Sequence, residues 1–334
     1  MTINIYPQIV HDNDLSPDVG YGPEIDEACE DIVKACKGIG SNAKKCIEVM
    51  GAFNTEDRYK LAARFKELND GKRLDALMKK EMSGDFGNAM QFVGLPPHEA
   101  ECAMIKKAAK GIGANAFVIM SILVGRTNEE MEILKKTYFR MYTRDLGKKL
   151  AAELHGDNER LIFNCLQAAE EVYDPQFHTM EKAVEDATTI NDQGQGKFFG
   201  TNERAIFKII CASPPEHLEN INKVYADKYG YALWKAMEKE LCGNAERACI
   251  HLVNMKLKPY EAIAKLIKDA CKGMGTKDLL LTSSIIRYQH VMNFVQPAHI
   301  ELFSKSIQDR IREETGGKYR DILLAVMNTA WPEG

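Results

Sequence analysis

Two short sequence motifs recur together along the chain at a nearly constant spacing. The first, K-G-x-G, occupies 37–40, 110–113 and 272–275, with a degenerate copy at 197–201. The second, E-x-x-G, follows each copy and occupies 81–84, 153–156, 240–243 and 314–317. From the last glycine of the first motif to the glutamate of the second, the step is 41, 40, 40 and 39 residues. Four matched pairs indicate an internal repeat, so the 334 residues form four units in place of the two domains that length alone suggests.

Each unit is predicted to be helical. In the second unit, apolar residues fall at i, i+3, i+7, i+10 and i+11, which places them on one face of a helix: Met131, Leu134, Tyr138, Met141 and Tyr142. Thr127 to Glu130 fits a capping box ahead of that helix, Pro214 suits a first helical turn in the third unit, and Gln296-Pro297 opens the corresponding helix of the fourth. No segment shows the sustained alternation that is typical of strands. We therefore predict an all-α fold with about five helices in each unit.

Breaks in the helical pattern set the predicted boundaries. Proline and glycine between residues 6 and 23 indicate a tail outside the first unit. The glycine-to-glycine period is 73, 87 and 75 residues, so the third unit carries an insertion, which we assign to a loop near 190–196. The predicted division is a tail at 1–23 and units at 24–95, 96–173, 174–256 and 257–334.

Charge and hydropathy exclude several kinds of protein. Lys and Arg number 44 against 48 Asp and Glu, and a formal net charge of −4 provides no basic field for nucleic acid. Residues 1–10 contain no Lys or Arg and no apolar core of signal-peptide length, so no secretory route is indicated. The longest apolar run, 116–124, is under half of the roughly 20 residues that a membrane-spanning helix needs. We expect a cytoplasmic protein that does not cross a membrane.

Neither the cysteines nor the histidines form a catalytic pattern. Nine cysteines are scattered without a C-x-x-C pair, which is typical of reduced thiols packed as small apolar residues. The sequence contains no G-x-S-x-G, no H-E-x-x-H and no P-loop motif, and its eight histidines are dispersed. We therefore predict that the protein is not an enzyme.

The paired motifs are suited to binding a hard cation. Two glycines that flank one residue allow positive φ, so successive backbone carbonyls can point outward on the same side of the turn. A glutamate later in the unit can return to this turn if the helices stack as hairpins. Carbonyls, one carboxylate and water match the roughly 6 to 8 oxygen ligands of Ca²⁺ and leave open positions for a phosphate. A lone K-G-x-G turn is more often only a helix C-cap, but its fourfold recurrence with a glutamate favours a calcium site.

Over about residues 24–331, this combined pattern resembles the annexin family. The resemblance implies four repeats of five helices each, arranged as a curved disc with calcium sites on the convex face. It implies Ca²⁺ as the cofactor and acidic, phosphatidylserine-like phospholipid membranes as the partner. The expected function is calcium-dependent binding of the protein, as a peripheral membrane protein, to the cytosolic face of membranes.

The resemblance also assigns candidate residues position by position. The expected metal ligands are Cys36, Gly38, Gly40 and Glu81 in the first unit, Ala109, Gly111, Gly113 and Glu153 in the second, Gly196, Phe198, Gly200 and Glu240 in the third, and Cys271, Gly273, Gly275 and Glu314 in the fourth. The glutamates supply carboxylates and the other residues supply backbone carbonyls. The expected membrane contacts are Lys37, Ile39, Lys110, Ile112, Phe198, Phe199, Lys272 and Met274. For the two phenylalanines, packing in the core is the alternative.

Several positions depart from the family pattern. Thr follows the turn glycine at Thr201 and Thr276, but Ser41 and Ala114 replace it in the first two units. Ala114 has no hydroxyl for a lipid head group, so we expect weaker lipid binding at the second turn. These deviations resemble a divergent branch such as the protist annexins that include the giardins, some of which are linked to cytoskeleton or flagella. The alternative function is a helical-repeat scaffold that binds cytoskeletal or other protein partners with reduced lipid binding.

Overall fold

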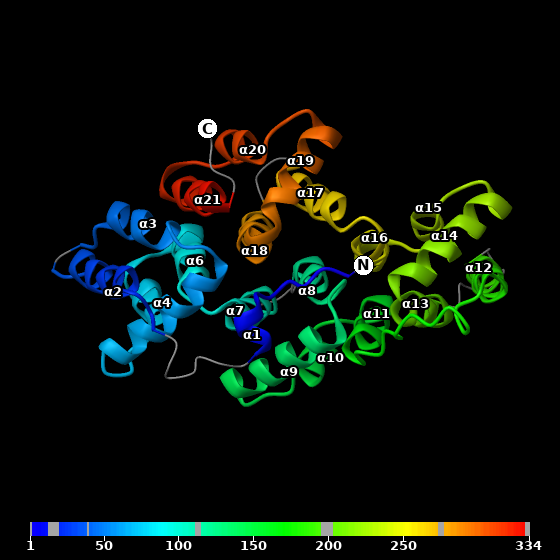
Figure 1. Cartoon of the computed structure of the whole chain (residues 1–334), viewed down its shortest axis with the longest axis horizontal. Helices are drawn as coiled ribbons and strands as arrows, with labels where there is room; N and C mark the ends of the chain where they lie inside the picture. Colours follow the sequence, from blue (N-terminus) through cyan, green and yellow to red (C-terminus); the bar gives the residue numbers. More distant parts are fainter. Residues whose placement is uncertain are drawn as a thin grey trace. The chain divides into compact units, whose positions relative to one another are not determined.

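The computed structural model describes residues 2–12, 20–38, 40–110, 115–194, 203–272 and 277–330. Within these ranges the regular elements are helices and no strand is formed, which confirms the all-α prediction (Figure 1). None of the helices there is long and apolar enough to cross a membrane.

The α-helices follow one another in four sets of five. The first set is α2 (Pro23–Ala35), α3 (Ala43–Gly51), α4 (Thr55–Leu68), α5 (Leu74–Glu81) and α6 (Gly84–Val93). The second is α7 (Pro97–Ala108), α8 (Ala116–Leu123), α9 (Asn128–Tyr142), α10 (Leu146–Ala151) and α11 (Asp157–Leu166). The third is α12 (Met180–Gly194), α13 (Glu203–Ala212), α14 (Pro215–Tyr229), α15 (Leu233–Glu240) and α16 (Gly243–Leu257).

The fourth set completes the repeat. It comprises α17 (Pro259–Ala270), α18 (Asp278–Arg287), α19 (Met292–Phe303), α20 (Ile307–Glu314) and α21 (Gly317–Ala330). Two short elements lie outside the sets: α1 (Gln8–His11) and a 3₁₀ segment, η1 (Gln289–Val291). Four repeats of five helices, as the motif spacing predicts, are therefore present in the described part of the chain.

Local signals place some helix starts correctly. Thr127 Oγ1 accepts a hydrogen bond from the Glu130 amide at 3.2 Å and caps α9, as the capping-box prediction requires. In α14 the first helical residue is Pro215, and the predicted Pro214 is the N-cap one residue earlier.

The predicted helix start at Gln296-Pro297 is wrong. Helix α19 begins at Met292, and Pro297 lies inside it. Met292 and Val295 are fully buried, so packing of the first turn against the core outweighs the cost of a proline within the helix.

The predicted loop near 190–196 is wrong for its first five residues, because α12 continues to Gly194. Ile190 is fully buried, and the Tyr225 hydroxyl donates a hydrogen bond to Asn191 Oδ1 at 3.4 Å, so this turn of helix packs into the core. The long connection of the third repeat lies earlier, at 167–179, between α11 and α12.

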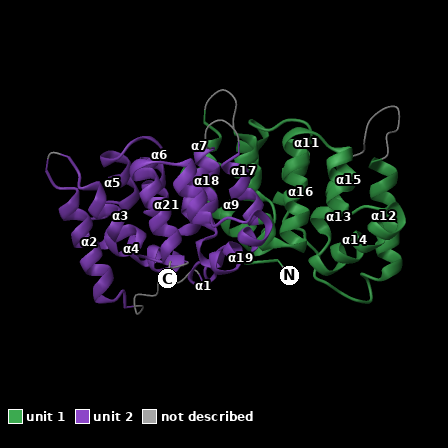
Figure 2. Ribbon diagram, turned by 90° about the horizontal axis from the view of Figure 1, so that it is seen from above, with its two compact units in different colours: residues 1–4, 105–262 green, residues 5–104, 263–334 purple. Residues whose placement is uncertain are grey.

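The helices also group into two compact units, called unit 1 and unit 2, which are larger than the four sequence repeats. Figure 2 colours them separately. Unit 1 comprises Met1–Asn4 and Ile105–Ala262, and unit 2 comprises Ile5–Met104 and Ile263–Gly334. In unit 1, α12 packs on α13 and α14, and α11 packs on α8, α13 and α16. In unit 2, α21 packs on α3 and α6, and α18 packs on α6. Each unit thus combines helices of two repeats, the second with the third and the first with the fourth.

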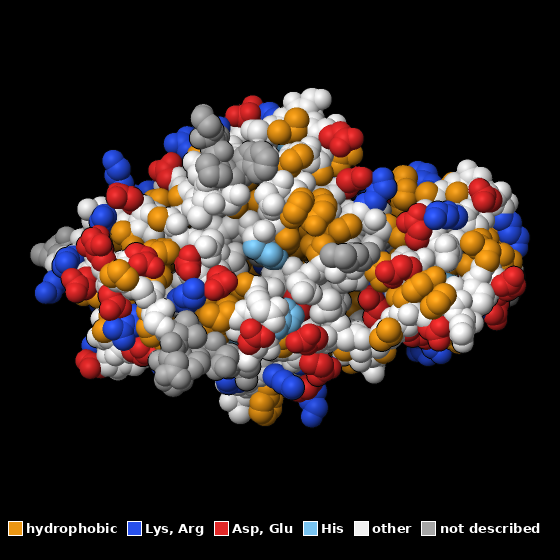
Figure 3. Space-filling view, in the orientation of Figure 1, with side chains coloured by type: hydrophobic (Ala, Val, Ile, Leu, Met, Phe, Trp, Pro, Cys, Tyr) orange, Lys and Arg blue, Asp and Glu red, His pale blue; other side chains and the backbone are white. Residues whose placement is uncertain are grey.

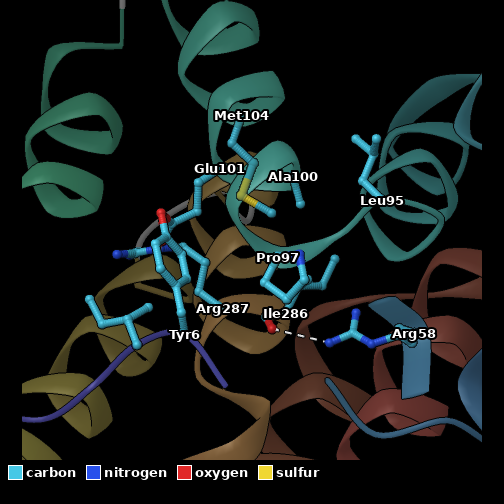
Figure 4. Close-up of a pocket in the computed structure, with 10 residues that line it drawn as sticks. Tyr6, Arg58, Leu95, Pro97, Ala100, Glu101, Met104, Ile286 and Arg287 are labelled. Atoms are coloured by element: carbon cyan, nitrogen blue, oxygen red, sulfur yellow. Dashed lines mark hydrogen bonds and ion pairs between the residues drawn. The ribbon is translucent and has the colours of Figure 1, made fainter. Parts of the chain in front are cut away.

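Part of the predicted tail packs into unit 2. Ile5 and Tyr6 are buried, and the Tyr6 hydroxyl donates a hydrogen bond to the carboxylate of Glu101. Arg287 Nε donates to the same carboxylate at 2.6 Å, and both charged side chains are almost completely buried. Figure 4 shows these three side chains converging beside a cavity of about 10 Å³. The start of the chain is therefore held by a buried ion pair that the sequence did not indicate.

Candidate metal centres

In the described residues, the turns between the first two helices of the first, second and fourth repeats are closed by the same backbone hydrogen bond. Its acceptor is the carbonyl of the last residue of the preceding helix, and its donor is the amide seven residues later. The pairs are Asn42 to Ala35 at 2.7 Å, Asn115 to Ala108 at 2.9 Å, and Lys277 to Ala270 at 2.8 Å. The described residues on either side of the K-G-x-G motif are therefore joined by the same hydrogen bond in the first, second and fourth repeats.

The donor residues of the first two turns also begin the next helix. Asn42 Oδ1 accepts a hydrogen bond from the Lys45 amide at 3.1 Å and caps α3. Asn115 Oδ1 accepts one from the Val118 amide at 3.2 Å and caps α8. Lys277 precedes α18 without a side-chain cap. Such a cap stabilises a helix by about 1 kcal/mol, so it ties the first two turns firmly to their following helices.

The first turn has carbonyl oxygens that are available as ligands. Gly38 and Gly40 have φ of +98° and +83°, the positive values predicted from the motif and rarely adopted by other residues. Both glycines are exposed, and Cys36 before them is half-buried. Among the described residues, no backbone amide donates a hydrogen bond to the carbonyl oxygen of Cys36, Gly38 or Gly40. Hard oxygen donors are therefore available to a ligand at this turn.

Glu81, the last residue of α5, lies next to the first turn. Ser41 Oγ donates to its backbone carbonyl at 3.5 Å. Burial raises the pKa of the Cys36 thiol, and the charge of Glu81 raises it further, as expected for a carboxylate close to the turn. The Glu81 side chain is 18% exposed and lies 3.4 Å from the Nζ of Lys80, which is itself 80% exposed. The structure thus brings together two parts of the chain that lie 40 residues apart.

The second turn has a competing cation. Glu153 follows α10, and its Oε1 lies 2.5 Å from Lys149 Nζ, with 20% and 22% of the two side chains exposed. Ala109, the first predicted carbonyl donor, is buried. The predicted donors Gly111 and Gly113 lie outside the described residues. A metal ion bound to Glu153 would have to replace Lys149.

In the third repeat, Glu240 lies against the residue that precedes the predicted turn. A Cβ atom on Gly194, the last residue of α12, would lie 2.8 Å from Glu240 Cγ. Burial raises the pKa of Glu240, and the charge of Lys239 opposes the shift. A desolvated carboxylate of this kind gains from a nearby cation. The predicted donors Gly196, Phe198 and Gly200 lie outside the described residues.

The fourth repeat resembles the first in the described residues. Cys271 is buried next to the last residue of α17, and Glu314 is the last residue of α20. Burial raises the pKa of Cys271 to about 12, and the charge of Glu314 contributes, so this glutamate also lies near the turn. The predicted donors Gly273 and Gly275 lie outside the described residues.

The glycine of the second motif has one conformation in all four repeats. Its φ is positive, at +64°, +61°, +65° and +57° for Gly84, Gly156, Gly243 and Gly317. Each of these glycines is at or directly before the first residue of the last helix of its repeat. The E-x-x-G motif therefore sets the corner that follows the glutamate, a role the sequence did not reveal.

Three of the predicted membrane contacts can be placed. Lys37, Lys110 and Lys272 are exposed at the ends of their turns. The other five lie outside the described residues: Ile39, Ile112, Phe198, Phe199 and Met274.

Side chains alone do not build a metal site in the ranges that the structure describes. No group of three or more His, Cys, Asp or Glu side chains there is arranged to hold a metal ion. A site at these turns therefore depends on backbone carbonyls with one carboxylate. Sequence reasoning overlooked Lys149, although its i,i+4 spacing from Glu153 is a known signal for an ion pair on a helix. It also overlooked the capping role of Asn42 and Asn115, which is typical of asparagine directly before a helix.

These features define a class: an all-helical repeat protein in which a glutamate late in the first, third and fourth repeats lies near the turn between the first two helices, with exposed backbone carbonyls at the first turn. The annexin family model matches residues 27–92, 99–164 and 186–252, which is more than half of the chain. The chain belongs to the annexin family.

Curated relatives and solved structures agree with this membership. Human annexin A13 is 26% identical over 308 residues, covering 92% of this chain and 96% of the relative. A solved structure of annexin A8 has a TM-score of 0.83 at 26% identity and covers 94% of this chain and 97% of that one. The calcium-bound structure of alpha-14 giardin has a TM-score of 0.76 at 19% identity, covering 91% and 99%, and shows similarity of fold. Annexins bind phospholipids in a calcium-dependent manner, associate peripherally with membranes and are generally not enzymes.

Proposed function

We propose that this annexin binds acidic phospholipid membranes through calcium ions held at its turns. In the first repeat the carbonyls of Cys36, Gly38 and Gly40 and the carboxylate of Glu81 would hold the ion. The observation that carries the proposal is the position of Glu81 beside a turn whose carbonyl oxygens accept no other backbone hydrogen bond among the described residues.

The available donors fit calcium better than a softer metal. Carbonyl and carboxylate oxygens are the ligands that Ca²⁺ prefers, and a single carboxylate leaves positions for water or a lipid phosphate. When bound, the ion would supply positive charge between protein and phosphate. A site with one formal negative charge is weak by itself, so binding of ion and lipid should support each other.

The chain's own charges explain why a cation is needed. The net charge of −4 repels an acidic bilayer, and acidic and basic side chains are interspersed over the face shown in Figure 3. Exposed Lys37, Lys110 and Lys272 lie at the turns, where they can approach lipid phosphates. Three lysines add a local attraction that supports docking without replacing the ion.

The remaining turns extend the proposal. The ligands would be Ala109, Gly111, Gly113 and Glu153 in the second repeat, Gly196, Phe198, Gly200 and Glu240 in the third, and Cys271, Gly273, Gly275 and Glu314 in the fourth. Ile39, Ile112, Phe198, Phe199 and Met274 would contact the lipid. Several weak sites on one protein act together through effective concentration, so membrane binding should rise steeply with calcium. The site of action would be the cytosolic face of membranes.

Co-sedimentation with vesicles tests the proposal. The protein should pellet with phosphatidylserine vesicles in calcium and stay in the supernatant with a chelator or with phosphatidylcholine vesicles. Equal pelleting with calcium and with chelator would contradict it. A variant with Glu81, Glu153, Glu240 and Glu314 all changed to Gln should stay soluble at calcium concentrations that pellet the native protein.

The second candidate is a helical-repeat scaffold for cytoskeletal or other protein partners. It is favoured by the Lys149–Glu153 ion pair, which occupies one predicted ligand, and by Ala114, which lacks a hydroxyl. A scaffold should bind its partners equally with and without calcium. Loss of vesicle binding in the four-glutamate variant would favour the membrane function instead.

A further inference from the structure

Away from the turns, two cysteine side chains of unit 1 lie in contact. Cys165 on α11 and Cys211 on α13 have sulfur atoms 3.7 Å apart, and both residues are half-buried. Their helices pack directly against each other. To form a bond of about 2.05 Å, the sulfurs would have to approach by about 1.7 Å.

A buried cation lies at the same end of α13. Lys256 Nζ donates hydrogen bonds to the carbonyls of Ile210, Cys211 and Ser213 at 2.9, 3.1 and 2.6 Å. It also pairs with Glu170 Oε2 at 2.8 Å, and only 3% of its side chain is exposed. These four contacts fix its positive charge beside the cysteine pair.

The surroundings divide the two thiols into different roles. A hydrogen bond from Cys165 lowers the pKa of Cys211, and the charge of Lys256 lowers it further. The same hydrogen bond and burial raise the pKa of Cys165. The thiolate is the reactive form of cysteine, so these opposite directions favour Cys211 as the attacking thiol.

A small molecule can reach the pair. Both cysteines line a cavity of about 30 Å³, together with Lys256 and Glu170. About 10–15 Å³ is enough for one water molecule. The cavity therefore has room for a molecule as small as hydrogen peroxide, which has two oxygen atoms.

We propose that Cys165 and Cys211 are a peroxide-sensitive dithiol that forms a reversible disulfide between α11 and α13. The Cys211 thiolate attacks one oxygen of hydrogen peroxide, the O–O bond breaks, and the leaving hydroxide takes a proton to become water. The Cys165 sulfur, after losing its proton, attacks the resulting sulfenic acid and displaces its oxygen as a second water. In total, two thiols lose two electrons and two protons, and one peroxide is reduced to two waters.

The disulfide would cross-link neighbouring repeats. It joins the last helix of the second repeat to the second helix of the third, across 46 residues that include the connection at 167–179. Closing such a loop restricts the unfolded chain, so oxidised protein should resist denaturant more than reduced protein. Thiol reduction would reverse the effect.

The chain contains a matched comparison pair. Cys36 and Cys46 in unit 2 have sulfur atoms 3.8 Å apart, almost the same separation. No buried lysine lies against that pair among the described contacts. A third cysteine of unit 1, Cys249 on α16, is fully buried close to Cys165 and Cys211. Distance alone predicts equal reactivity for the two pairs, and the proposal predicts very different rates.

Disulfide mapping tests the proposal on the full chain. Reduced protein is treated with hydrogen peroxide under native conditions, quenched with N-ethylmaleimide, digested and analysed by mass spectrometry. The Cys165–Cys211 cross-link should appear at least about tenfold faster than a Cys36–Cys46 cross-link, and dithiothreitol should remove it. Equal rates for the two pairs, a preferred cross-link to Cys249, or no cross-link would overturn the proposal.

Cys165→Ser and Cys211→Ser identify the attacking thiol, and Cys249→Ser is the control. In Cys165→Ser, Cys211 should stop at sulfenic acid and be labelled by dimedone, and the urea midpoint should no longer rise on oxidation. In Cys249→Ser, the cross-link and the rise in urea midpoint should both persist. Dimedone labelling of Cys165 in Cys211→Ser, at the rate seen for Cys211 in Cys165→Ser, would contradict the assignment of roles.

Discussion

The first and second turns are closed by equivalent hydrogen bonds, but their glutamates have different partners. Asn42 and Asn115 close the turns with equivalent hydrogen bonds and cap the next helices equally. Glu81 lies 3.4 Å from a highly exposed lysine, whereas Glu153 is paired at 2.5 Å with a lysine that is about as buried as itself. The described ends of the two turns are thus alike, and the lysine beside each glutamate differs in distance and burial. On our proposal, the first turn binds calcium more tightly than the second.

Removing each carboxylate should give the largest difference. Glu81→Gln should raise the calcium midpoint of vesicle binding about tenfold, the equivalent of about 1.4 kcal/mol. Glu153→Gln should raise it only about twofold to threefold, because that carboxylate is already shared with Lys149. Co-sedimentation over a calcium series measures both midpoints.

Glu48→Gln is the matched control for these variants. Glu48 lies on α3, its side chain is 68% exposed, and it pairs loosely with Lys45 at 3.6 Å. The control should leave the midpoint unchanged. An equal effect of Glu81→Gln and Glu153→Gln would remove the distinction between the two turns.

The equivalent helix caps of the first two turns predict equal losses of stability when either cap is removed. Asn42→Ala and Asn115→Ala should each lower the free energy of unfolding by about 1 kcal/mol, because each removes one helix cap. Lys277→Ala, at the position without a side-chain cap, should cost less than half of that. Urea unfolding monitored by circular dichroism provides the three values. A loss confined to one asparagine would show that the two turns are not equivalent.

Breaking the Lys149–Glu153 ion pair should make the calcium affinity of the second turn more like that of the first. Lys149→Met frees Glu153 for a metal ion, so the calcium midpoint should fall about threefold, as expected for a partly buried ion pair. Lys80→Met should change it less, because Lys80 is 80% exposed and screened by water. The two variants remove the same charge and differ only in its position. A midpoint that rises in Lys149→Met would mean that this lysine contacts lipid instead of competing with calcium.

The smallest effect is expected at the residue that follows the turn. Ser41→Ala removes a weak hydrogen bond to the Glu81 carbonyl at 3.5 Å. It also places at this position the residue that the second turn has there, Ala114. Unfolding free energy should change by no more than about 0.5 kcal/mol. The calcium midpoint should move by no more than about twofold on the same vesicle assay. A larger shift would identify the hydroxyl, and not Lys149, as the origin of the difference between the turns.

The repeat was predictable because glycine and glutamate carry strong local signals at fixed spacing. The capping box at Thr127 and the positive φ of Gly38 and Gly40 follow directly from residue type. Packing of buried side chains determines the two helix boundaries that were predicted wrongly. The buried Ile190 keeps α12 helical beyond its predicted end, and the buried start of α19 overrides the signal of Pro297.

Contacts between distant segments were not predictable from the sequence. The buried pair of Arg287 and Glu101 joins residues 186 positions apart, and it holds Tyr6 from the segment expected to be a tail. The contact between Cys165 and Cys211 spans a linker whose length alone does not fix the approach of α11 to α13. The Lys149–Glu153 ion pair and the two asparagine caps could have been found, because each joins residues within four positions of each other.

Locating calcium by anomalous diffraction tests the central claim most directly. Crystals of the protein grown with calcium, at a concentration that pellets it with phosphatidylserine vesicles, should show an ion bound by the carbonyls of the first turn and by Glu81. Occupancy there should exceed occupancy beside Glu153, where Lys149 should have moved away from the carboxylate wherever an ion is present. An ordered first turn without an ion under those conditions, or an ion beside Glu153 alone, would contradict the account.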